Sequence, residues 1–425
     1  MFNHSCTNIG ATGAALAAAL MLASAAAPAQ TTAMSPTVSF EQIAKQALAT
    51  HPAILSRRSS STAARADLDA AEWQRYPTPS LEANYDHNGV TTTSLRVQQP
   101  LWAGGRIDAG IDAANFHLQA SNTAIDETKQ DILYRVISAY VEAVRQQARE
   151  ETLAQGVQQH ERLLGLITRR VEHEASPRVD QELAQSRLYQ ANNDLSQVTQ
   201  ALANALTQLS QLAGMPVRRV GSLEADNLPG QQSRESMLAR ALAWSPTLHR
   251  LKHEEEAAQA DIESKRASYK PQVSLRFDNS HVSAALNGVP AFSSSRLMLV
   301  VEAQTGAGLS ALANVDAAIA RRDAAREQRE TAVRDVQERL TMDWDELQAA
   351  RMRLENAMLA SKSSKEVYES YERQYTAGRK TWLDVLNTVR ESTQADVAVT
   401  DASAQASAAL LRLKLDTGTL KGLAE

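Results

Sequence analysis

The sequence has almost no cysteine and few aromatic residues. Cys6 is the only cysteine, and phenylalanine, tryptophan and tyrosine together make up 4% of the 425 residues. A lone cysteine excludes an intramolecular disulfide framework and any site built from several thiolates. The scarcity of rings argues against an ordinary globular core, which aromatic side chains usually help to fill. Small and medium apolar residues instead suit the seams between long packed helices.

The chain also lacks a strongly basic composition and long apolar runs, and each absence excludes a class of function. The net charge is only −5 and the isoelectric point is near 6.0, so the chain lacks the basic character of a nucleic-acid-binding protein. After the N-terminal region no run of about 18 apolar residues occurs, so the sequence predicts no transmembrane helix.

Residues 1–29 are predicted to be a secretory signal peptide. They contain no Lys, Arg, Asp or Glu, and Leu16–Ala27 is an apolar run of the length of a signal-peptide core, followed by a small-x-small cleavage site at Ala27–Ala29. The basic residue that usually precedes the core is missing, which leaves the true start of the signal open. Cleavage removes Cys6, so the mature chain has no cysteine for lipid attachment. An exported chain without a transmembrane helix is periplasmic, secreted or a β-barrel of the outer membrane.

The chain repeats itself with a period near 200 residues. Residues 47–52 resemble 241–246, and 77–81 resemble 271–275, both at a shift of 194; Gly214 matches Gly418 at a shift of 204. The ten-residue difference falls within 278–294, which is predicted to be a longer loop. We therefore expect two repeats, 30–220 and 221–425, each containing a helix, a pair of strands, a very long helix, a turn and a closing helix.

The absence of helix-breaking residues from a long segment predicts an uninterrupted helix. Residues 309–377 contain neither Gly nor Pro, and no proline follows Pro290. A helix of that length extends roughly 100 Å at about 1.5 Å per residue, which no ordinary globular domain accommodates. The first repeat has a matching segment from about 106 to 172. Apolar residues recur every seven positions in the second segment, as in a coiled coil, at Val333, Leu340, Leu347 and Leu354.

Two segments alternate with a period of two, which predicts β-hairpins over about 78–101 and 271–302. Leu81, Ala83 and Tyr85, for example, alternate with polar neighbours. Such strands suit a barrel with lipid outside and water inside. A half-buried hairpin of a soluble protein has the same pattern, and that alternative stays open here. Four strands are too few to close a barrel, so strands in a membrane must be pooled between subunits.

These features together resemble the TolC family of outer-membrane export ducts, over essentially the whole mature chain. The segments that carry the resemblance are Val97–Arg106, Leu212–Pro216 and Tyr375–Leu386, in this order on a tandem repeat. The resemblance implies a mainly α protomer with long antiparallel coiled-coil helices and four strands. It also implies a homotrimer with one 12-stranded barrel in the outer-membrane lipid of a Gram-negative bacterium. A helical tunnel would continue from the barrel into the periplasm.

The resemblance also implies a gate at the periplasmic turns, where family members close through polar contacts. Lys380 stands where the best-known member has Arg, which keeps the charge but loses the bidentate fork. Asn387 replaces a second acid, which halves the charge of an acidic ring. Without the family, polar residues at a solvated helical turn would be the ordinary interpretation. The matching residues are Asp180, Tyr375, Lys380, Asp384 and Asn387.

Aromatic residues flank the predicted hairpins at Tyr76, Trp102, Tyr269 and Phe292. Tryptophan and tyrosine gather where a barrel meets the membrane interface, so these four residues are candidates for an aromatic belt. Packing anchors between the helices and the strands would look the same in sequence. Both interpretations stand at this point.

A finer resemblance concerns the branch of the family. Arg379–Asn387 and Val300–Leu309 look like the branch that serves type I secretion of large adhesins, since the second segment lacks the proline found at the same place in repeat one. The alternative explanation for the missing proline is that one of the two repeats has diverged in sequence.

Catalytic chemistry is not predicted. His249 and His253 lie four apart beside three glutamates, yet no third metal ligand is fixed by spacing and no H-E-x-x-H motif occurs. Gly104-Gly105 is not followed by the Lys-Ser/Thr of a phosphate-binding loop. We therefore predict no enzyme activity, no cofactor, no metal site and no nucleic-acid partner.

The predicted function is that of a passive exit duct. Energy must come from a partner, either an inner-membrane ABC transporter or an RND-type pump, joined through a periplasmic adaptor protein. Type I protein secretion is the first choice, and efflux of drugs or metals by an RND-type pump is the alternative. A periplasmic coiled-coil adaptor or a stalk explains less, because neither accounts for duplication of the whole unit together with paired strands.

Overall fold

The computed structural model describes residues 37–87, 90–223, 233–283, 290–303 and 310–420. The predicted signal peptide over 1–29 lies outside these residues. The first half contains α1 (Phe40–Thr50), α2 (Pro52–Trp73), β1 (Thr78–Tyr85), β2 (Thr91–Trp102), α3 (Arg106–Glu172) and α4 (Arg178–Ala213). The second half contains α5 (Arg234–Trp244), α6 (Pro246–Ala267), β3 (Gln272–Val282), β4 (Phe292–Glu302), α7 (Ser310–Thr376) and α8 (Trp382–Asp416).

Matching elements of the two halves have nearly equal lengths. Helices α1 and α5 each have 11 residues, and α2 and α6 each have 22. The two longest helices, α3 and α7, each have 67 residues, and the closing helices have 36 and 35. The duplication seen in the sequence therefore extends to the secondary structure.

Local signals explain where the helices begin and end. Ser39 forms a capping box at the start of α1, in which its side chain accepts from the Gln42 backbone N–H. Pro52 and Pro246 occupy the first position of α2 and α6, where the missing N–H costs nothing. Helix α4 ends at Gly214, which adopts a left-handed φ of 66°. The long helices lack such breakers, and α3 continues through its internal glycines.

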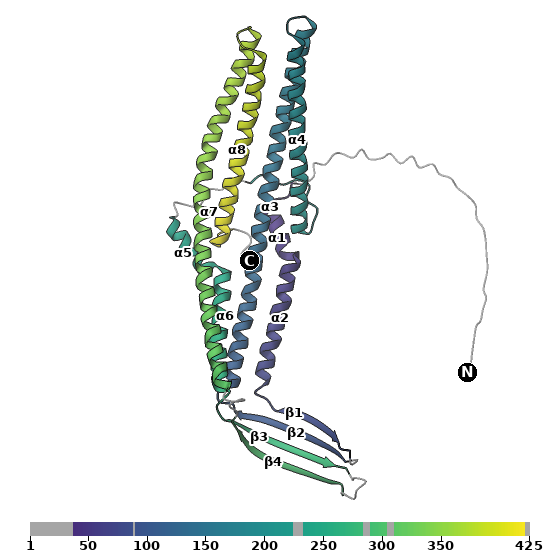
Figure 1. Ribbon diagram of the computed structural model, residues 1–425, viewed down its shortest axis with the longest axis vertical. Coiled ribbons are helices and arrows are strands. Elements are labelled where there is room, and N and C mark those ends of the chain that lie inside the picture. The colour runs from purple at the N-terminus through teal and green to yellow at the C-terminus, as the bar shows by residue number, and fades with distance from the viewer. Residues whose placement is uncertain (1–36, 88–89, 224–232, 284–289, 304–309, 421–425) are drawn as a thin grey trace, which may run out of the picture. The chain divides into compact units, whose positions relative to one another are not determined.

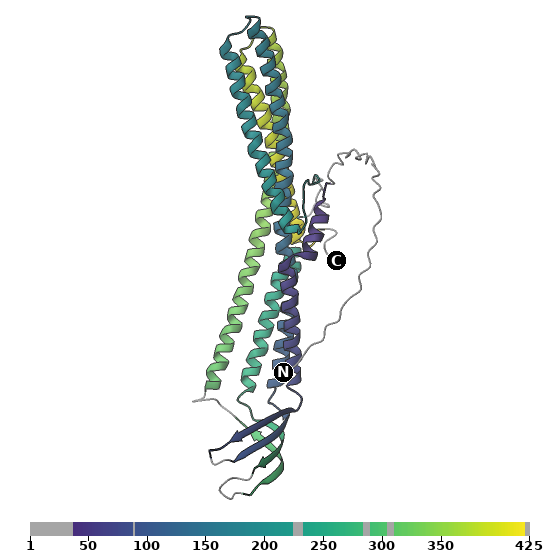
Figure 2. The same ribbon diagram turned by 90° about the vertical axis from the view of Figure 1, so that its right-hand side faces the viewer.

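The helices pack in two antiparallel coiled pairs, α3 with α4 and α7 with α8 (Figure 1). Helix α3 also lies beside α2, α6 and α8, so it connects both repeats. The turns of both pairs lie at one end of the helices, and the sheet follows α2 and α6 at the other end (Figures 1 and 2). None of the described helices is long and apolar enough to cross a membrane.

The four strands form one antiparallel sheet in the order β1-β2-β3-β4. The register places Leu81 opposite Leu95, and Phe277 opposite Leu297, so that one face is apolar except toward the β3–β4 hairpin, where Asn279 and Ser295 share it. The other face is polar, with an ion pair of 2.8 Å between Arg96 Nε and Asp278 Oδ1. The sequence predicted a loop over 278–294. This prediction is wrong at both ends, because β3 continues to Val282 and β4 begins at Phe292. Polar residues such as Asp278 belong to the polar face of the sheet.

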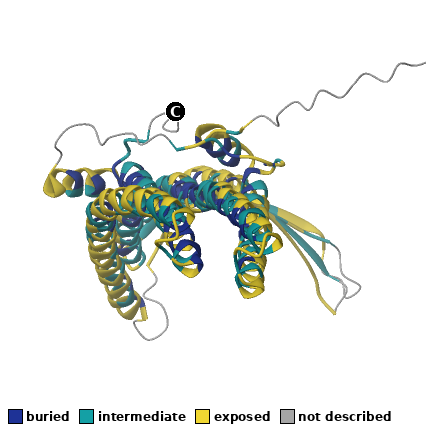
Figure 3. Ribbon diagram, turned by 90° about the horizontal axis from the view of Figure 1, so that it is seen from above, coloured by how far each residue is buried: buried dark blue, intermediate teal, exposed yellow. Residues whose placement is uncertain are grey.

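Buried residues form three clusters along the helices, on the faces that the helices turn toward one another (Figure 3). The largest cluster joins α1 and α3 to the ends of α4 and α8 and includes Ile43, Ile137, Tyr140, Leu209 and Leu415. A second cluster packs α5 against α7 and α8. It contains Leu340 and Leu347 of the predicted heptad seam, whereas Val333 and Leu354 are half-buried. The third cluster lies at the turns.

Candidate functional site at the helical tips

The two helical tips, α3–α4 and α7–α8, have the same backbone turn. In each, the N–H of a residue after the helix donates to a carbonyl five positions earlier, from Ala175 to Arg170 at 2.7 Å and from Arg379 to Gln374 at 2.9 Å. The preceding residue is left-handed in both, Glu174 with φ 55° and Gly378 with φ 72°. Repeat one therefore places a glutamate where repeat two has the glycine that this conformation favours.

This difference gives a first prediction. Replacing Glu174 with Gly is expected to stabilise the first tip by about 0.5–1 kcal/mol, because a Cβ is strained in the left-handed region. Replacing Gly378 with Ala is expected to destabilise the second tip by about 1–2 kcal/mol. Hydrogen exchange of tip amides measures both effects. Ala377→Gly is the control, and a stabilisation equal to that of Glu174→Gly would contradict the explanation.

A hydrophobic cluster, which we call the tip cluster, joins the two tips. Trp382 is 3% exposed, its ring centroid lies 5.1 Å from that of Tyr375, and its Nε1 donates to the backbone carbonyl of Asp180 at 2.9 Å. This contact links the start of α8 to the start of α4. The tip cluster consists of Leu163, Ile167, Ala184, Tyr368, Tyr375, Trp382, Val385, Leu386 and Val389.

Within one protomer Tyr375 is buried in the tip cluster. Its side chain is 8% exposed, and its hydroxyl is buried without a hydrogen-bond partner among the described residues. The guanidinium of Arg170 lies 5.1 Å from the ring centroid, within the range of a cation–π contact. Within one protomer Tyr375 thus acts through packing, and a polar contact of its hydroxyl across subunits stays a prediction.

Two charged residues of the predicted gate, Lys380 and Asp384, are partly exposed at the second tip, whereas Asp180 is partly exposed at the start of α4, in the first tip. The Nζ of Lys380 lies 4.1 Å above the centroid of the Tyr371 ring. Asp384 forms a capping box with Thr381, whose hydroxyl and backbone N–H hold the pKa of Asp384 below its usual range, with help from Lys380. A carboxylate is favoured there, because a helix N-terminus carries partial positive charge. Asn387 is half-buried on the next turn of α8.

Trp382, Arg170 and Arg162 contribute to the tip but were absent from the sequence prediction. Arg162 of α3 donates from Nη2 to the Tyr368 hydroxyl of α7 at 2.5 Å and lies 3.6 Å from Glu372 Oε1. The burial of Trp382 could have been expected from the sequence. This tryptophan follows an N-capping threonine and occupies the first position of a helix, where a large apolar side chain can pack against the neighbouring tip. The arginines had none, because their partners lie about 200 residues away.

The aromatic residues beside the sheet are all exposed in the protomer. Tyr76, Trp102 and Tyr269 lie where strands join helices, whereas Phe292 lies at the opposite end of the sheet, opposite Val282. Their exposed fractions run from 38% to 55%. The four residues thus mark two levels about one strand length apart. Their assignment to a membrane interface stays a prediction.

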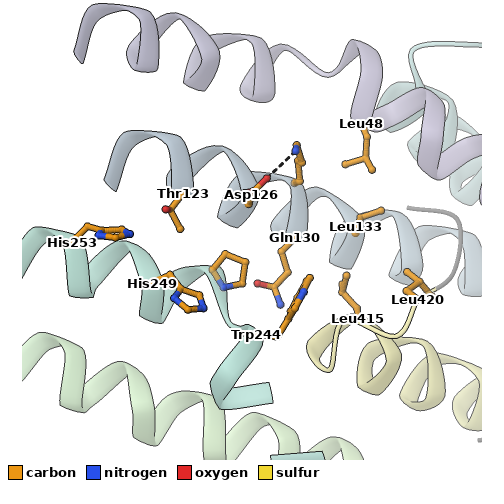
Figure 4. Close-up of a pocket in the computed structure, with 13 residues that line it drawn as sticks. Leu48, Thr123, Asp126, Gln130, Leu133, Trp244, His249, His253, Leu415 and Leu420 are labelled. Atoms are coloured by element: carbon orange, nitrogen blue, oxygen red, sulfur yellow. Dashed lines mark hydrogen bonds and ion pairs between the residues drawn. The ribbon is translucent and has the colours of Figure 1, made fainter. Parts of the chain in front are cut away.

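His249 and His253 line a cavity of about 460 Å³ between α3, α6 and the end of α8, together with Gln130 and Trp244 (Figure 4). Nε2 of His249 lies 2.9 Å from the Ala243 carbonyl oxygen, and Nδ1 of His253 lies 3.0 Å from a Glu256 oxygen. Both imidazoles therefore have protein partners. Within the described residues no group of three His, Cys, Asp or Glu side chains is arranged to hold a metal ion.

Comparison with known proteins identifies relatives of this architecture. The family model described as outer membrane efflux protein matches residues 43–215 and 237–419. A membrane protein from Pseudomonas aeruginosa superposes with a TM-score of 0.78 at 20% identity, covering 91% of each chain. The outer-membrane channel OprN gives 0.78 at 18% identity over 89% of this chain and 90% of that chain. The open state of the MtrE outer membrane channel of Neisseria gonorrhoeae gives 0.74 at 18% identity over 91% and 90%.

No curated protein matches the chain significantly in sequence. The structural relatives share the fold at low identity, and they confirm the predicted tandem-repeat protomer of long helices and four strands. The two segments matched by the family model each contain one long helix with its closing helix.

Proposed function

The chain belongs to the outer membrane efflux protein family, and we propose that three copies form the exit duct of an export complex. Membership confirms the predicted family, the outer-membrane location, and the prediction of a passive channel rather than an enzyme. The trimer and its partners are the proposal. The duct would conduct substrate from a periplasmic adaptor and an inner-membrane pump to the exterior.

The sheet is the observation that best supports this proposal. Its apolar face is exposed in the protomer, with Leu81 at 73% and Leu297 at 67%. Strands β2, β3 and β4 have 12, 11 and 11 residues, and about 9–11 tilted residues suffice to cross a bilayer. An apolar outer face toward lipid and a polar inner face toward water is the arrangement of a membrane barrel.

The edges of the sheet explain why several copies are required. Strands β1 and β4 are the two edges of the protomer's sheet. Unpaired backbone groups on an edge strand cannot remain in hydrocarbon, because no water is present to bond them. Pairing β1 of one copy with β4 of the next satisfies both edges, and three copies supply the 12 strands of a closed barrel.

Two pump classes remain as candidates for the energy source. The stretch Arg379–Asn387 resembles the type I secretion branch and supports an ABC transporter with a protein substrate. The description of the matching family as efflux proteins supports an RND-type pump with small substrates. A host that lacks its own exit duct separates the two. Restored secretion of a type I substrate favours the first, and restored drug or metal resistance favours the second.

A substitution on the apolar face gives the second prediction. Leu297→Arg is expected to cost about 2–4 kcal/mol per copy, because Leu297 lies at the middle of β4, where arginine would face the bilayer midplane. In water the same change at a residue 67% exposed would have little effect. The measurement is the amount of trimer extracted from the outer membrane and sized in detergent without boiling.

Ser294→Arg on the polar face of the same strand is the matched control, since its partner in the register is Ser280. We expect the unmodified chain and this control in the outer-membrane fraction at about three times the protomer mass. A soluble monomer in the periplasm, or equal yields for Leu297→Arg and the control, would contradict the membrane barrel.

A further inference from the structure

A second cavity, of about 380 Å³, lies where α3, α4 and α8 meet. Its α3 wall is one stripe of the helix, with Arg149, Gly156 and His160 spaced by seven and four residues. Arg187 of α4 and Arg390 of α8 stand on the other walls. The cavity thus joins side chains from both repeats, and it is separate from the tip cluster and from the cavity beside His249.

Gly156 sets the spacing between the two repeats at this point. A Cβ at Gly156 would lie 3.1 Å from Thr393 Cγ2 of α8, tighter than an ordinary contact between such atoms. Helices α3 and α8 therefore come together closely at Gly156. The larger side chains one turn before and after it line the opening that remains against α4.

The charge of the cavity is positive. Three arginines line it, Arg149, Arg187 and Arg390, against the lining carboxylate of Asp194 and that of Asp401, which faces Arg149. Arg187 uses Nη1 to donate to Gln190 Oε1 at 3.1 Å. Among the described residues, Arg149 has an ion-pair contact with Asp401 of α8, whose Oδ1 lies 3.8 Å from the Arg149 Nε. A guanidinium group has five N–H donors, so Arg149 and Arg187 keep further N–H groups that can donate to another acceptor.

His160 supplies a second, independent observation. Its side chain is 7% exposed, and its Nδ1 is buried without a hydrogen-bond partner among the described residues. The Nε of Arg149 also lacks a hydrogen bond, but it faces the equally unpaired Oδ1 of Asp401 at 3.8 Å. Burial, and to a smaller degree Arg187, lowers the pKa of His160. Buried polar groups are nearly always hydrogen-bonded, so the unpaired Nδ1 of His160 in a basic cavity points to a partner that the described residues do not provide.

We propose that this cavity binds a small oxyanion, carrying phosphate or carboxylate groups, between α3, α4 and α8. Arginine forks match the planar oxygen pairs of such groups and bond them bidentately. A volume of about 380 Å³ accommodates an anion of the size of a phosphate ester or a tricarboxylate. The bound anion would tie Arg187 of repeat one to Arg390 of repeat two.

Binding would therefore hold together the helices that must separate when the tip of the duct widens. This consequence rests on the proposed function, whereas binding itself does not. A ligand that favours the arrangement in which α4 and α8 are close shifts the population toward that arrangement. Oxyanions would accordingly reduce the open fraction of the channel.

The test uses the full chain in detergent with inorganic phosphate and citrate as probes, at ionic strength matched with sodium chloride. We expect saturable binding by calorimetry and a rise in melting temperature. Arg187→Gln and Arg390→Gln should each weaken binding about tenfold, and Arg187→Lys should restore part of it. Arg351→Gln, at an exposed position of α7, is the control.

Absence of saturable binding at matched ionic strength, or equal weakening by Arg351→Gln, would overturn the proposal. A chain that binds phosphate with the expected variant profile yet never assembles in the outer membrane would refute the proposed function and leave the anion site standing. The two failures are therefore distinguishable.

Discussion

Replacing Trp382 with Ala is expected to open the helical tips. The change removes the ring contact with Tyr375 and the hydrogen bond to the Asp180 carbonyl, and it leaves a cavity in the tip cluster. Such truncations of a buried tryptophan cost about 3–5 kcal/mol. The rest of the chain should stay folded, because two other buried clusters lie away from the tips. Local opening of the tips should become on the order of 10²–10⁴ times more frequent.

Hydrogen exchange at the tip amides measures this opening, and single-channel conductance in a planar bilayer measures its effect on the proposed duct. We expect faster exchange and a higher conductance. Trp382→Phe keeps a ring but loses the N–H donor, so its effect should be about 1 kcal/mol plus a small packing loss. Leu383→Ala, at a neighbouring residue that is 48% exposed, is the control. If Trp382→Ala behaves like Leu383→Ala, the tip cluster does not hold the helices together.

The stability of the junction between α3, α7 and α8 is expected to fall as the pH rises. Asp416 is 7% exposed; Tyr134 and Gln130 donate hydrogen bonds to its Oδ1, and its Oδ2 is buried without a partner among the described residues. Burial raises the pKa of Asp416 to about 6 from a model-compound value of 3.8. Because the folded-state pKa lies above the unfolded one, folding favours the protonated form.

The direction and size of this effect follow from linkage. The stabilising contribution is complete below the unfolded pKa of 3.8 and is lost as the pH rises through about 6. The difference between the folded and unfolded pKa corresponds to roughly 3 kcal/mol over the whole range, and the part between pH 5 and pH 7.5 is on the order of 1 kcal/mol. Burial likewise raises the pKa of Asp343, which lies on α7 and bonds Arg412 of α8.

Asp416→Asn tests this prediction, because the amide stays neutral and its oxygen can still accept from Tyr134. The variant should be more stable than the unmodified chain at pH 7.5 and should lose most of the pH dependence of α8 opening measured by hydrogen exchange. Asp335→Asn, at an exposed position of α7, is the control. An unchanged pH profile in Asp416→Asn would assign the dependence to other groups.

Much of the fold was predictable from local patterns. The missing glycine and proline over 309–377 predicted α7, which runs from 310 to 376, and the segment 106–172 coincides with α3. The alternation around Leu81 and Leu275 predicted the strands and their two faces. The exception was the hairpin between β3 and β4, where polar residues such as Asp278 and Asn279 lie on both faces of the sheet and so looked like a loop.

The candidate site was less predictable. The resemblance to the family implied that Tyr375 is a polar gate residue, which stays a prediction; in the protomer its ring packs in the tip cluster against Trp382. The same limitation applies to Arg162 and Tyr368, which lie 206 positions apart and meet only because two coiled pairs stand side by side. A resemblance to a family pointed to the two turns that the structure shows between α3 and α4 and between α7 and α8, but it did not indicate which residues there are buried.

The sequence by itself determined the period of each segment, the duplication, and the polar and apolar faces of the strands. These properties depend on neighbours a few residues apart, through helix breakers and side-chain alternation. Only the tertiary structure decided that Trp382 joins the two tips, that Asp416 is buried, and that the cavity beside Gly156 is lined by three arginines. Burial and charge pairing arise from contacts between segments about 200 residues apart, and such contacts leave no local pattern in a single sequence.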